Sequence, residues 1–163
     1  MNSTHFSNIE NTELGVFTGE VKAAKAPAVL WCPALGSCVA VILYDQERKI
    51  GGLAHVMLPS TYDHVDGHDL KYASHAIKEL MRQMDELGAH LEAIKARLVG
   101  GALMIRGGPD VGKDNIEAIK KILDTLGIQI IGERLGGEKG RTVFFDLSTG
   151  EVHVKENQNQ FTI

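Results

Sequence analysis

The chain has 163 residues, of which 44% are hydrophobic and 23% charged, enough apolar material for the core of one ordinary domain. Its 17 basic and 21 acidic residues give a net charge of −4, and this acidic balance argues against nucleic acid as a partner. The apolar runs are too short to span a membrane and no signal peptide opens the chain, so we expect no membrane insertion. Two cysteines, Cys32 and Cys38, are too few for a disulfide scaffold, which favours a reducing, cytoplasmic compartment.

The two ends of the chain are polar and aperiodic. We expect a mobile N-terminal arm over residues 1–13 and a C-terminal tail over residues 156–163. Residues 14–155 contain neither a linker nor an internal repeat, and they are predicted to form one domain.

Strands dominate the first part of this domain. Residues 38–44 (CVAVILY) are almost wholly apolar, as expected for a strand covered on both faces, and residues 50–58 resemble its returning partner. The polar turn 45–49 joins the two, which predicts a β-hairpin. Two shorter strands are predicted before it, over residues 14–21 and 28–31.

Two amphipathic helices are predicted farther along the chain. The first has Asp69 as its N-cap and ends near Leu87, and the second covers residues 113–126. Further strands are predicted over residues 94–105, 129–131, 142–147 and 151–154, with a turn over 148–150 between the last two. The elements together predict an α/β fold, a single-domain layered sandwich in which a mixed β-sheet with β-hairpins packs against two main helices.

Cys38 and His55 are candidates for nucleophilic catalysis. Cys38 follows Gly36 and Ser37, where a glycine allows a sharp bend that exposes backbone N–H groups beside the thiol. His55 lies on the returning arm of the hairpin, so the two side chains are expected to meet. Paired in this way, the imidazole takes the thiol proton and leaves a nucleophilic thiolate at neutral pH. The alternative is a buried thiol that packs as a small hydrophobe beside a hydrogen-bonded core histidine.

Two further features are explained more simply by structure than by a catalytic or metal-binding role. Cys32 is expected to be a core thiol, with a regulatory disulfide to Cys38 as the alternative. His64, Asp66 and His68 alternate in a polar loop, which is typical of solvated surface rather than of a metal site.

A segment with the GxxxxGK pattern of a phosphate-binding loop covers Gly107–Lys113. Asp114 follows it where serine or threonine is needed, and a carboxylate there repels phosphate, so we assign Asp114 to the start of a helix. No metal or organic cofactor is predicted.

Six segments resemble the CheD family of chemoreceptor glutamine deamidases over about residues 14–155: LGSCVAVILYD, GGLAHVMLP, KYA, GGALM, VGKDNI, and GR with FFDLSTGEV. The resemblance implies a sandwich-like α/β domain in the cytoplasm that hydrolyses selected receptor glutamines to glutamates. It also implies that Cys38 is the nucleophile and His55 its base. Backbone N–H groups at Ser37 and Cys38 are the expected donors to the oxyanion of the tetrahedral intermediate.

The sequence departs from the family pattern at several positions. The family commonly has a threonine six residues before the nucleophile, completing a triad with the histidine, and this chain has Cys32 there. A thiol is the weaker hydrogen-bond partner. Three consequences are open: Cys32 does the task poorly, a backbone carbonyl orients His55, or activity is reduced. Ser74 replaces an acidic residue that is frequent in the family. In the segment Glu133–Gly137 the residue just before the glycine pair is not acidic, as it often is in the family, and both changes bear on rate or partner specificity.

The resemblance names two kinds of partner. One is the set of cytoplasmic helices of a chemoreceptor, which carry the substrate glutamines. The other is a CheC-type phosphatase, and a protein with a weakened triad would act mainly as an adaptor that binds and stimulates it. Loss of Cys38 should end deamidation, whereas an adaptor role would survive that loss.

Overall fold

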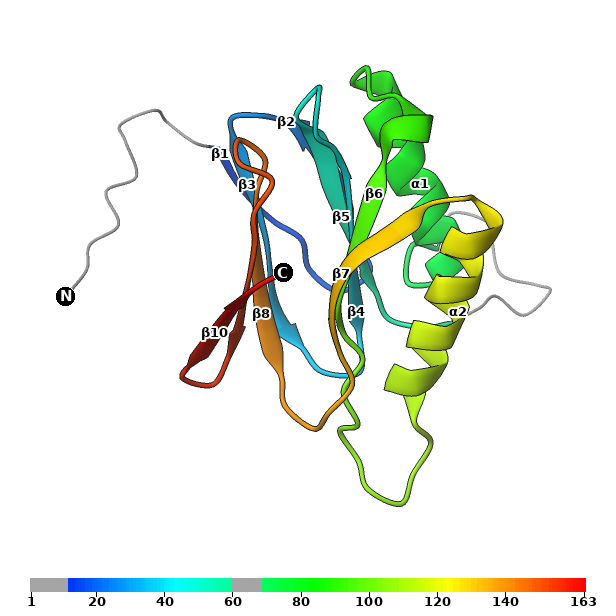
Figure 1. Cartoon of the computed structure of the whole chain (residues 1–163). Coiled ribbons are helices and arrows are strands. Elements are labelled where there is room, and N and C mark those ends of the chain that lie inside the picture. The colour runs from blue at the N-terminus through cyan, green and yellow to red at the C-terminus, as the bar shows by residue number, and fades with distance from the viewer. Residues whose placement is uncertain (1–11, 60–68) are drawn as a thin grey trace.

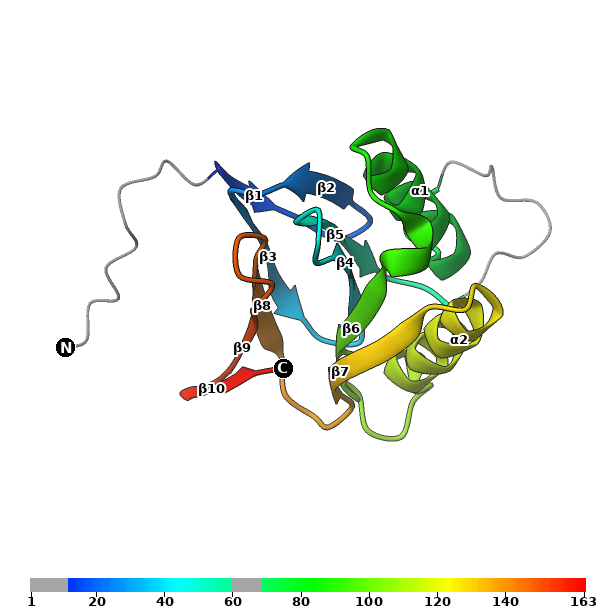
Figure 2. The same cartoon turned by 45° about the horizontal axis from the view of Figure 1, so that its top comes forward.

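The computed structural model describes residues 12–59 and 69–163, and within them ten strands and two α-helices form a layered α/β fold (Figure 1). One sheet has the strand order β1-β3-β8-β9-β10 and the other β2-β5-β4-β6-β7. Both helices cover the outer face of the second sheet, so the layers run sheet, sheet, helices (Figure 2). The strands are β1 (Thr12–Gly15), β2 (Val21–Lys25), β3 (Ala28–Leu35), β4 (Val39–Asp45), β5 (Ile50–Val56), β6 (Lys95–Gly100), β7 (Gln129–Leu135), β8 (Arg141–Asp146), β9 (Val152–Glu156) and β10 (Asn159–Thr162), and the helices are α1 (Ala73–Glu86), η1 (Leu91–Ala93, a 3₁₀ turn) and α2 (Val111–Thr125).

Apolar side chains fill both spaces between the layers. On β4, alternate residues point to opposite sides, so Val39 and Val41 pack under the helices while Ala40 and Ile42 pack between the sheets. Every residue of β4 and β5 is buried. The predicted α/β class and the doubly covered hairpin strands are therefore confirmed. The sequence had suggested a single mixed sheet, and the structure has two.

The strand predicted over 14–21 is wrong. β1 begins at Thr12, inside the expected arm, and stops at Gly15, and the next strand in this region, β2, begins only at Val21. A turn separates them, in which the Phe17 carbonyl accepts the Glu20 N–H at 2.9 Å and Gly19 has a φ of +76°. The turn is needed because β1 belongs to one sheet and β2 to the other.

The helix starts also differ from the prediction. Asp69 lies four residues before the first residue of α1 and does not cap the helix. Its Oδ1 instead accepts the Lys71 N–H at 3.1 Å. Helix α1 begins later because Tyr72 is still extended and forms a bridge with Leu58 in the segment after β5, where the Leu58 carbonyl accepts the Ala73 N–H. Helix α2 begins two residues earlier than predicted, since Asp110 serves as its N-cap and accepts the Lys113 N–H at 3.0 Å.

Two further predictions are corrected at strand ends. β6 stops at Gly100 rather than continuing to residue 105, because Gly100 and Gly101 both have positive φ. The expected C-terminal tail contains β10, which pairs antiparallel with β9, and its Phe161 lies under the Arg134 guanidinium, 3.8 Å from the ring centroid. A polar sequence thus forms an edge strand because a neighbouring strand and a cation cover it.

Neither α-helix in the described part of the chain is long and apolar enough to cross a membrane.

Candidate functional site

Cys38 lies where the chain crosses from one sheet to the other, between β3 and β4. The pairing of β3 with β8 is irregular between Cys32 and Leu35, and Ala34 there has a φ of +56°, so the strand bends before it leaves the sheet. Gly36 and Ser37 complete the crossing, and Cys38 is half-buried at its end. This bend brings the thiol to the rim of the space between the sheets.

His55 lies on the same face of the hairpin as Cys38. In the β4–β5 register, Ala40 is opposite His55 and Val39 opposite Val56. Because side chains alternate along a strand, Cys38 shares the face of Ala40 and is a diagonal neighbour of His55. His55 Nε2 has no hydrogen-bond partner among the described residues, so the structure shows no hydrogen bond between His55 and Cys38. Both side chains face the space between the sheets, and their catalytic pairing stays a prediction.

A hydrogen bond to a backbone carbonyl determines which nitrogen of the His55 imidazole carries the proton. His55 Nδ1 lies 3.1 Å from the carbonyl oxygen of Val16, and this oxygen can only accept a hydrogen bond, so Nδ1 carries the proton. The lone pair of the neutral ring is then on Nε2. Nε2 is buried and has no hydrogen-bond partner among the described residues. The free lone pair is what a general base requires.

The segment between β1 and β2 positions this carbonyl. Its Val16 N–H donates to the Trp31 carbonyl at 2.8 Å, on the other sheet from His55. The Gly19 N–H donates to the carbonyl of His55, and the His55 N–H donates to the carbonyl of Glu20, at 3.1 and 3.0 Å. The segment is thus fixed to β3 at one end and to the backbone of His55 at the other, so the ring orientation follows from the fold.

Cys32 contacts the same imidazole nitrogen. It lies on β3 with its side chain fully buried between the sheets, and its Sγ is 3.1 Å from His55 Nδ1. Since the Nδ1 proton faces the Val16 carbonyl, the sulfur is a second and weaker acceptor for it. Burial, followed by the nearby Cys38 thiolate, raises the pKa of Cys32 to about 12. Cys32 therefore stays protonated at neutral pH and both cysteines are free thiols.

Burial also governs the ionisation of the other two groups. It raises the pKa of the Cys38 thiol, against the opposing effect of a hydrogen bond from the residue's own backbone N–H. Burial lowers the pKa of His55, although the Val16 carbonyl and the charge of Glu20 act in the other direction. The resting pair is therefore a thiol beside a neutral imidazole.

The backbone of Cys38 is fixed by the glycine pair at the end of β6. The Cys38 carbonyl accepts the Gly101 N–H at 2.8 Å. A Cβ on Gly100 would lie 2.3 Å from that same oxygen, and the φ of Gly100 is +119°, so no other residue type fits without displacing Cys38. Of the GG pairs in the sequence, this one is tied directly to the candidate nucleophile.

Sequence analysis missed Asn115, which also contacts this region. Its Nδ2 lies 3.0 Å from the carbonyl oxygen of Ser37 and 3.1 Å from that of Met57, and the residue is fully buried. The available signal was a polar residue in the otherwise apolar stripe of α2, four residues before Ile119.

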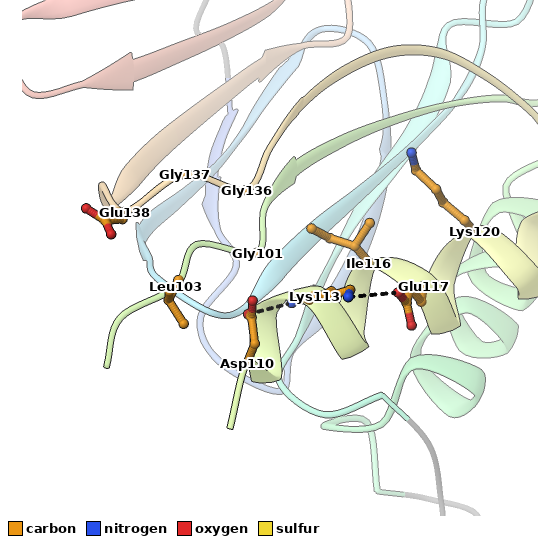
Figure 3. A pocket seen from close by; sticks show the side chains of 10 residues that line it. All are labelled: Gly101, Leu103, Asp110, Lys113, Ile116, Glu117, Lys120, Gly136, Gly137 and Glu138. Atoms are coloured by element: carbon orange, nitrogen blue, oxygen red, sulfur yellow. Dashed lines mark hydrogen bonds and ion pairs between the residues drawn. The ribbon is translucent and has the colours of Figure 1, made fainter. Parts of the chain in front are cut away.

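An open pocket of about 530 Å³ lies beside this site, between the start of α2 and the two glycine loops (Figure 3). Neither Cys38 nor His55 lines it. Its cations already have carboxylate neighbours: the Nζ of Lys113 is 4.0 Å from Glu117 and that of Lys120 is 3.1 Å from Glu133. The backbone N–H of Lys113 is used by Asp110. The contacts in the phosphate-loop-like segment are therefore those of a capped helix.

The described residues include no group of three or more side chains arranged to hold a metal ion. His64, Asp66 and His68 lie outside the described residues.

Comparison with known proteins places the chain in a family. The family model described as "CheD chemotactic sensory transduction" matches residues 57–156, starting two residues after His55. The "Probable chemoreceptor glutamine deamidase CheD" of Methanococcus maripaludis is 42% identical over 153 residues, covering 92% of this chain and 99% of that protein. The "Chemoreceptor glutamine deamidase CheD" of Thermotoga maritima is 39% identical over 139 residues (85% and 88%), and the Haloarcula marismortui protein, named as the first, is 35% identical over 161 residues (96% and 92%). The chain therefore belongs to the CheD family.

Proposed function

We propose that this protein is a chemoreceptor glutamine deamidase, which hydrolyses the side-chain amide of receptor glutamines to glutamate and ammonia. The relatives carry that name, and the chain has a thiol and an oriented imidazole on one face of a hairpin. One observation carries the mechanism: the Nδ1–H of His55 is directed at the Val16 carbonyl, which leaves Nε2 free to act as a base.

Acylation begins with proton transfer from Cys38 Sγ to His55 Nε2. The sulfur then attacks the carboxamide carbon of the glutamine, and the C=O bond becomes a C–O⁻ bond in the tetrahedral intermediate. The protonated imidazole donates its Nε2 proton to the departing nitrogen, so ammonia leaves and a thioester remains. Since Cys38 is a thiol at rest, this transfer from sulfur to imidazole must accompany every turnover.

Deacylation uses the same imidazole in the opposite order. His55 Nε2 removes a proton from water, the resulting hydroxide adds to the thioester carbon, and the tetrahedral intermediate expels the sulfur. The sulfur takes the proton back and the product is glutamate. Backbone N–H groups at Ser37 and Cys38 are the proposed donors to the oxyanion of both intermediates.

In this scheme Val16 supplies the third member of the constellation through its backbone carbonyl. Of the three consequences left open by the cysteine at position 32, the structure favours a carbonyl that orients His55. Cys32 packs against the ring and stays protonated.

The proposed partner is the cytoplasmic helical region of a chemoreceptor, and the proposed location is therefore the cytoplasm. Binding to a CheC-type phosphatase stays a prediction from the family resemblance, and no contact in the described residues favours it over catalysis.

The test is mass spectrometry of a chemoreceptor cytoplasmic fragment incubated with the wild-type protein and with Cys38→Ala. We expect the wild type to raise the mass of specific glutamine peptides by about one dalton, the difference between an amide and an acid, and Cys38→Ala to leave them unchanged. Matching circular dichroism and melting curves would show that the variant is folded. Equal conversion by both proteins would refute the proposed mechanism, and no conversion by the wild type would favour the adaptor role.

A further inference from the structure

Helix α2 places one polar side chain where its pattern calls for an apolar one. The buried residues of this helix are spaced about one turn apart, and Asn115 occupies the same stripe as Ile119 and Leu123. Asn115 is fully buried. A buried amide is costly unless it is hydrogen-bonded, so a residue of this kind needs a specific compensating interaction.

The compensation comes from two main-chain carbonyls on either side of the candidate site. Asn115 Nδ2 donates to the carbonyl of Ser37 at 3.0 Å and to that of Met57 at 3.1 Å. Both neighbours are acceptors, which fixes the side chain with its NH₂ group toward them. The Asn115 Oδ1 is buried and has no hydrogen-bond partner in the described part of the chain. The residue therefore acts as a donor, and both of its bonds go to the loops that flank Cys38 and His55.

The position of these carbonyls explains what the bonds do. The β4–β5 ladder ends at the pair Val39 and Val56, so Cys38 and Met57 are the first residues beyond it. Asn115 joins the two chains there by binding the Ser37 and Met57 carbonyls. The side chain thus continues the connection between the strands across the point where the nucleophile leaves the sheet.

The bond to Ser37 also sets the direction of the Cys38 N–H. The peptide bond between Ser37 and Cys38 is trans, so its C=O and N–H groups point in opposite directions. With the carbonyl directed at α2, the N–H is directed away from α2. The following peptide is fixed as well, because the Cys38 carbonyl accepts the Gly101 N–H.

We infer that Asn115 is a positioning residue for the deamidase reaction: by holding the Ser37 and Met57 carbonyls, it sets the Ser37–Cys38 peptide so that the nucleophile and its N–H donor face the substrate. This inference rests on the proposed function. The side-chain hydrogen bonds of Asn115 described above go to backbone carbonyls, so it acts on the thiol and the imidazole through the backbone.

The decisive variant is Asn115→Leu, which is close to asparagine in size and lacks both donors. We expect kcat on a receptor fragment to fall by about 10- to 100-fold with KM within about two-fold, since a small misplacement of reacting groups costs that much. We also expect iodoacetamide to alkylate Cys38 more slowly at neutral pH, with the midpoint of its pH profile moved upward, because the N–H that stabilises the thiolate is no longer held.

Ile119→Ala is the matched control, since it removes apolar contacts from the same stripe one turn away. It should lower the melting temperature and leave both kcat and the alkylation profile of the folded protein unchanged. If Asn115→Leu behaves in the same way, the residue is merely structural and the inference is overturned.

Should Asn115→Leu fail to fold, Asn115→Ser serves in its place, because one short hydroxyl cannot join both carbonyls. Wild-type kcat and alkylation in that variant would equally overturn the inference. Alkylation needs no receptor, so a chain without deamidase activity would refute the proposed function while the role of Asn115 would still be decided by iodoacetamide.

Discussion

At Cys38 and His55, burial acts on both ionisable groups in the same sense, because it disfavours the thiolate and the imidazolium alike. Burial raises the pKa of Cys38 and lowers the pKa of His55. A cysteine in this state reacts through general-base catalysis at the moment of attack, rather than as a preformed thiolate. At rest, Cys38 is therefore expected to react slowly with oxidants and electrophiles, because little of it is thiolate at neutral pH.

The pH dependence of the two groups follows from these shifts. We expect kcat/KM to be unchanged as the pH falls to 6.5, the ordinary pKa of histidine. It should fall only at lower pH, where His55 becomes protonated. Alkylation of Cys38 by iodoacetamide should have its midpoint above 9.0, with Cys38→Ala as the blank. A plateau of thiol reactivity extending below pH 7 would instead show a thiolate–imidazolium pair.

Substitutions of Cys32 test which group orients the His55 imidazole. If the Val16 carbonyl accepts the Nδ1 proton, Cys32→Ala should keep kcat within about three-fold of wild type, since only a weak sulfur contact is removed. Cys32→Thr, which restores a hydroxyl at the same place, should change kcat just as little. Steady-state kinetics on a receptor fragment would measure both, and a loss of 100-fold in Cys32→Ala would transfer the orienting role to the thiol.

At the level of elements, the β4–β5 hairpin positions Cys38 and His55, and the end of β6 restrains the backbone of Cys38. The hairpin register places His55 opposite Ala40, which lies two residues after Cys38. The approach of Gly100 to the Cys38 carbonyl then fixes how the loop enters β4. The candidate nucleophile thus lies on a loop held by a rigid scaffold, an arrangement that many active sites share.

Gly100→Ala should separate these two contributions. Its Cβ would lie 2.3 Å from the Cys38 oxygen at a φ of +119°, so we expect a loss of stability of more than about 1 kcal/mol together with a loss of kcat. Gly88→Ala is the control, because Gly88 has a φ of +99° and no neighbour within 4 Å. It should lose stability by strain alone and keep kcat. Thermal melts and receptor deamidation would measure the two effects, and full activity in Gly100→Ala would contradict the assigned restraint.

Across the molecule as a whole, a partly buried ion network joins the two sheets beside the candidate site. Arg141 on β8 and Arg134 on β7 each donate to Glu156 on β9, at 3.1 and 3.2 Å. Arg141 also donates to the Gly100 carbonyl at 3.2 Å. β8 and β9 belong to one sheet and β6 and β7 to the other, so the network connects the sheets at the glycine that restrains Cys38.

This network gives the stability a defined pH dependence. Burial alone would raise the pKa of Glu156, but the hydrogen bonds from Arg141 and Arg134 lower it below its usual value. Its contribution is therefore complete above the unfolded pKa of a glutamate and is lost as the pH falls through the lower folded pKa.

Glu156→Gln should cost about 1–3 kcal/mol at pH 7, because it leaves the buried Arg141 without its carboxylate. The difference from wild type should shrink as the pH falls below 4.5, the ordinary pKa of glutamate, and disappear once the folded carboxyl is itself protonated at lower pH. Urea unfolding at several pH values would measure it. Glu86→Gln, which alters an exposed pair with Arg82, should change stability little, and an equal cost in the two variants would show that the network adds nothing special.

Two predictions made from sequence alone are confirmed, the α/β class and the buried hairpin, while the catalytic pairing of Cys38 with His55 stays a prediction. These features are local: the apolar run 38–44, its returning partner and the turn between them lie within about 20 consecutive residues, so alternation and chain reversal specify the shared face. The family motifs are equally local, and they led to the same two residues.

The groups that support the candidate pair are brought to it by contacts between distant parts of the chain. Val16 acts through a carbonyl that every residue type has, so no side-chain pattern could indicate it. Asn115 lies far from Ser37 along the chain and contacts it only because α2 packs on the sheet. The division of the strands into two sheets, the late start of α1 and the strand β10 likewise depend on pairing between distant segments. Such contacts arise from packing of the whole chain, which periodicity and propensity along the sequence do not encode.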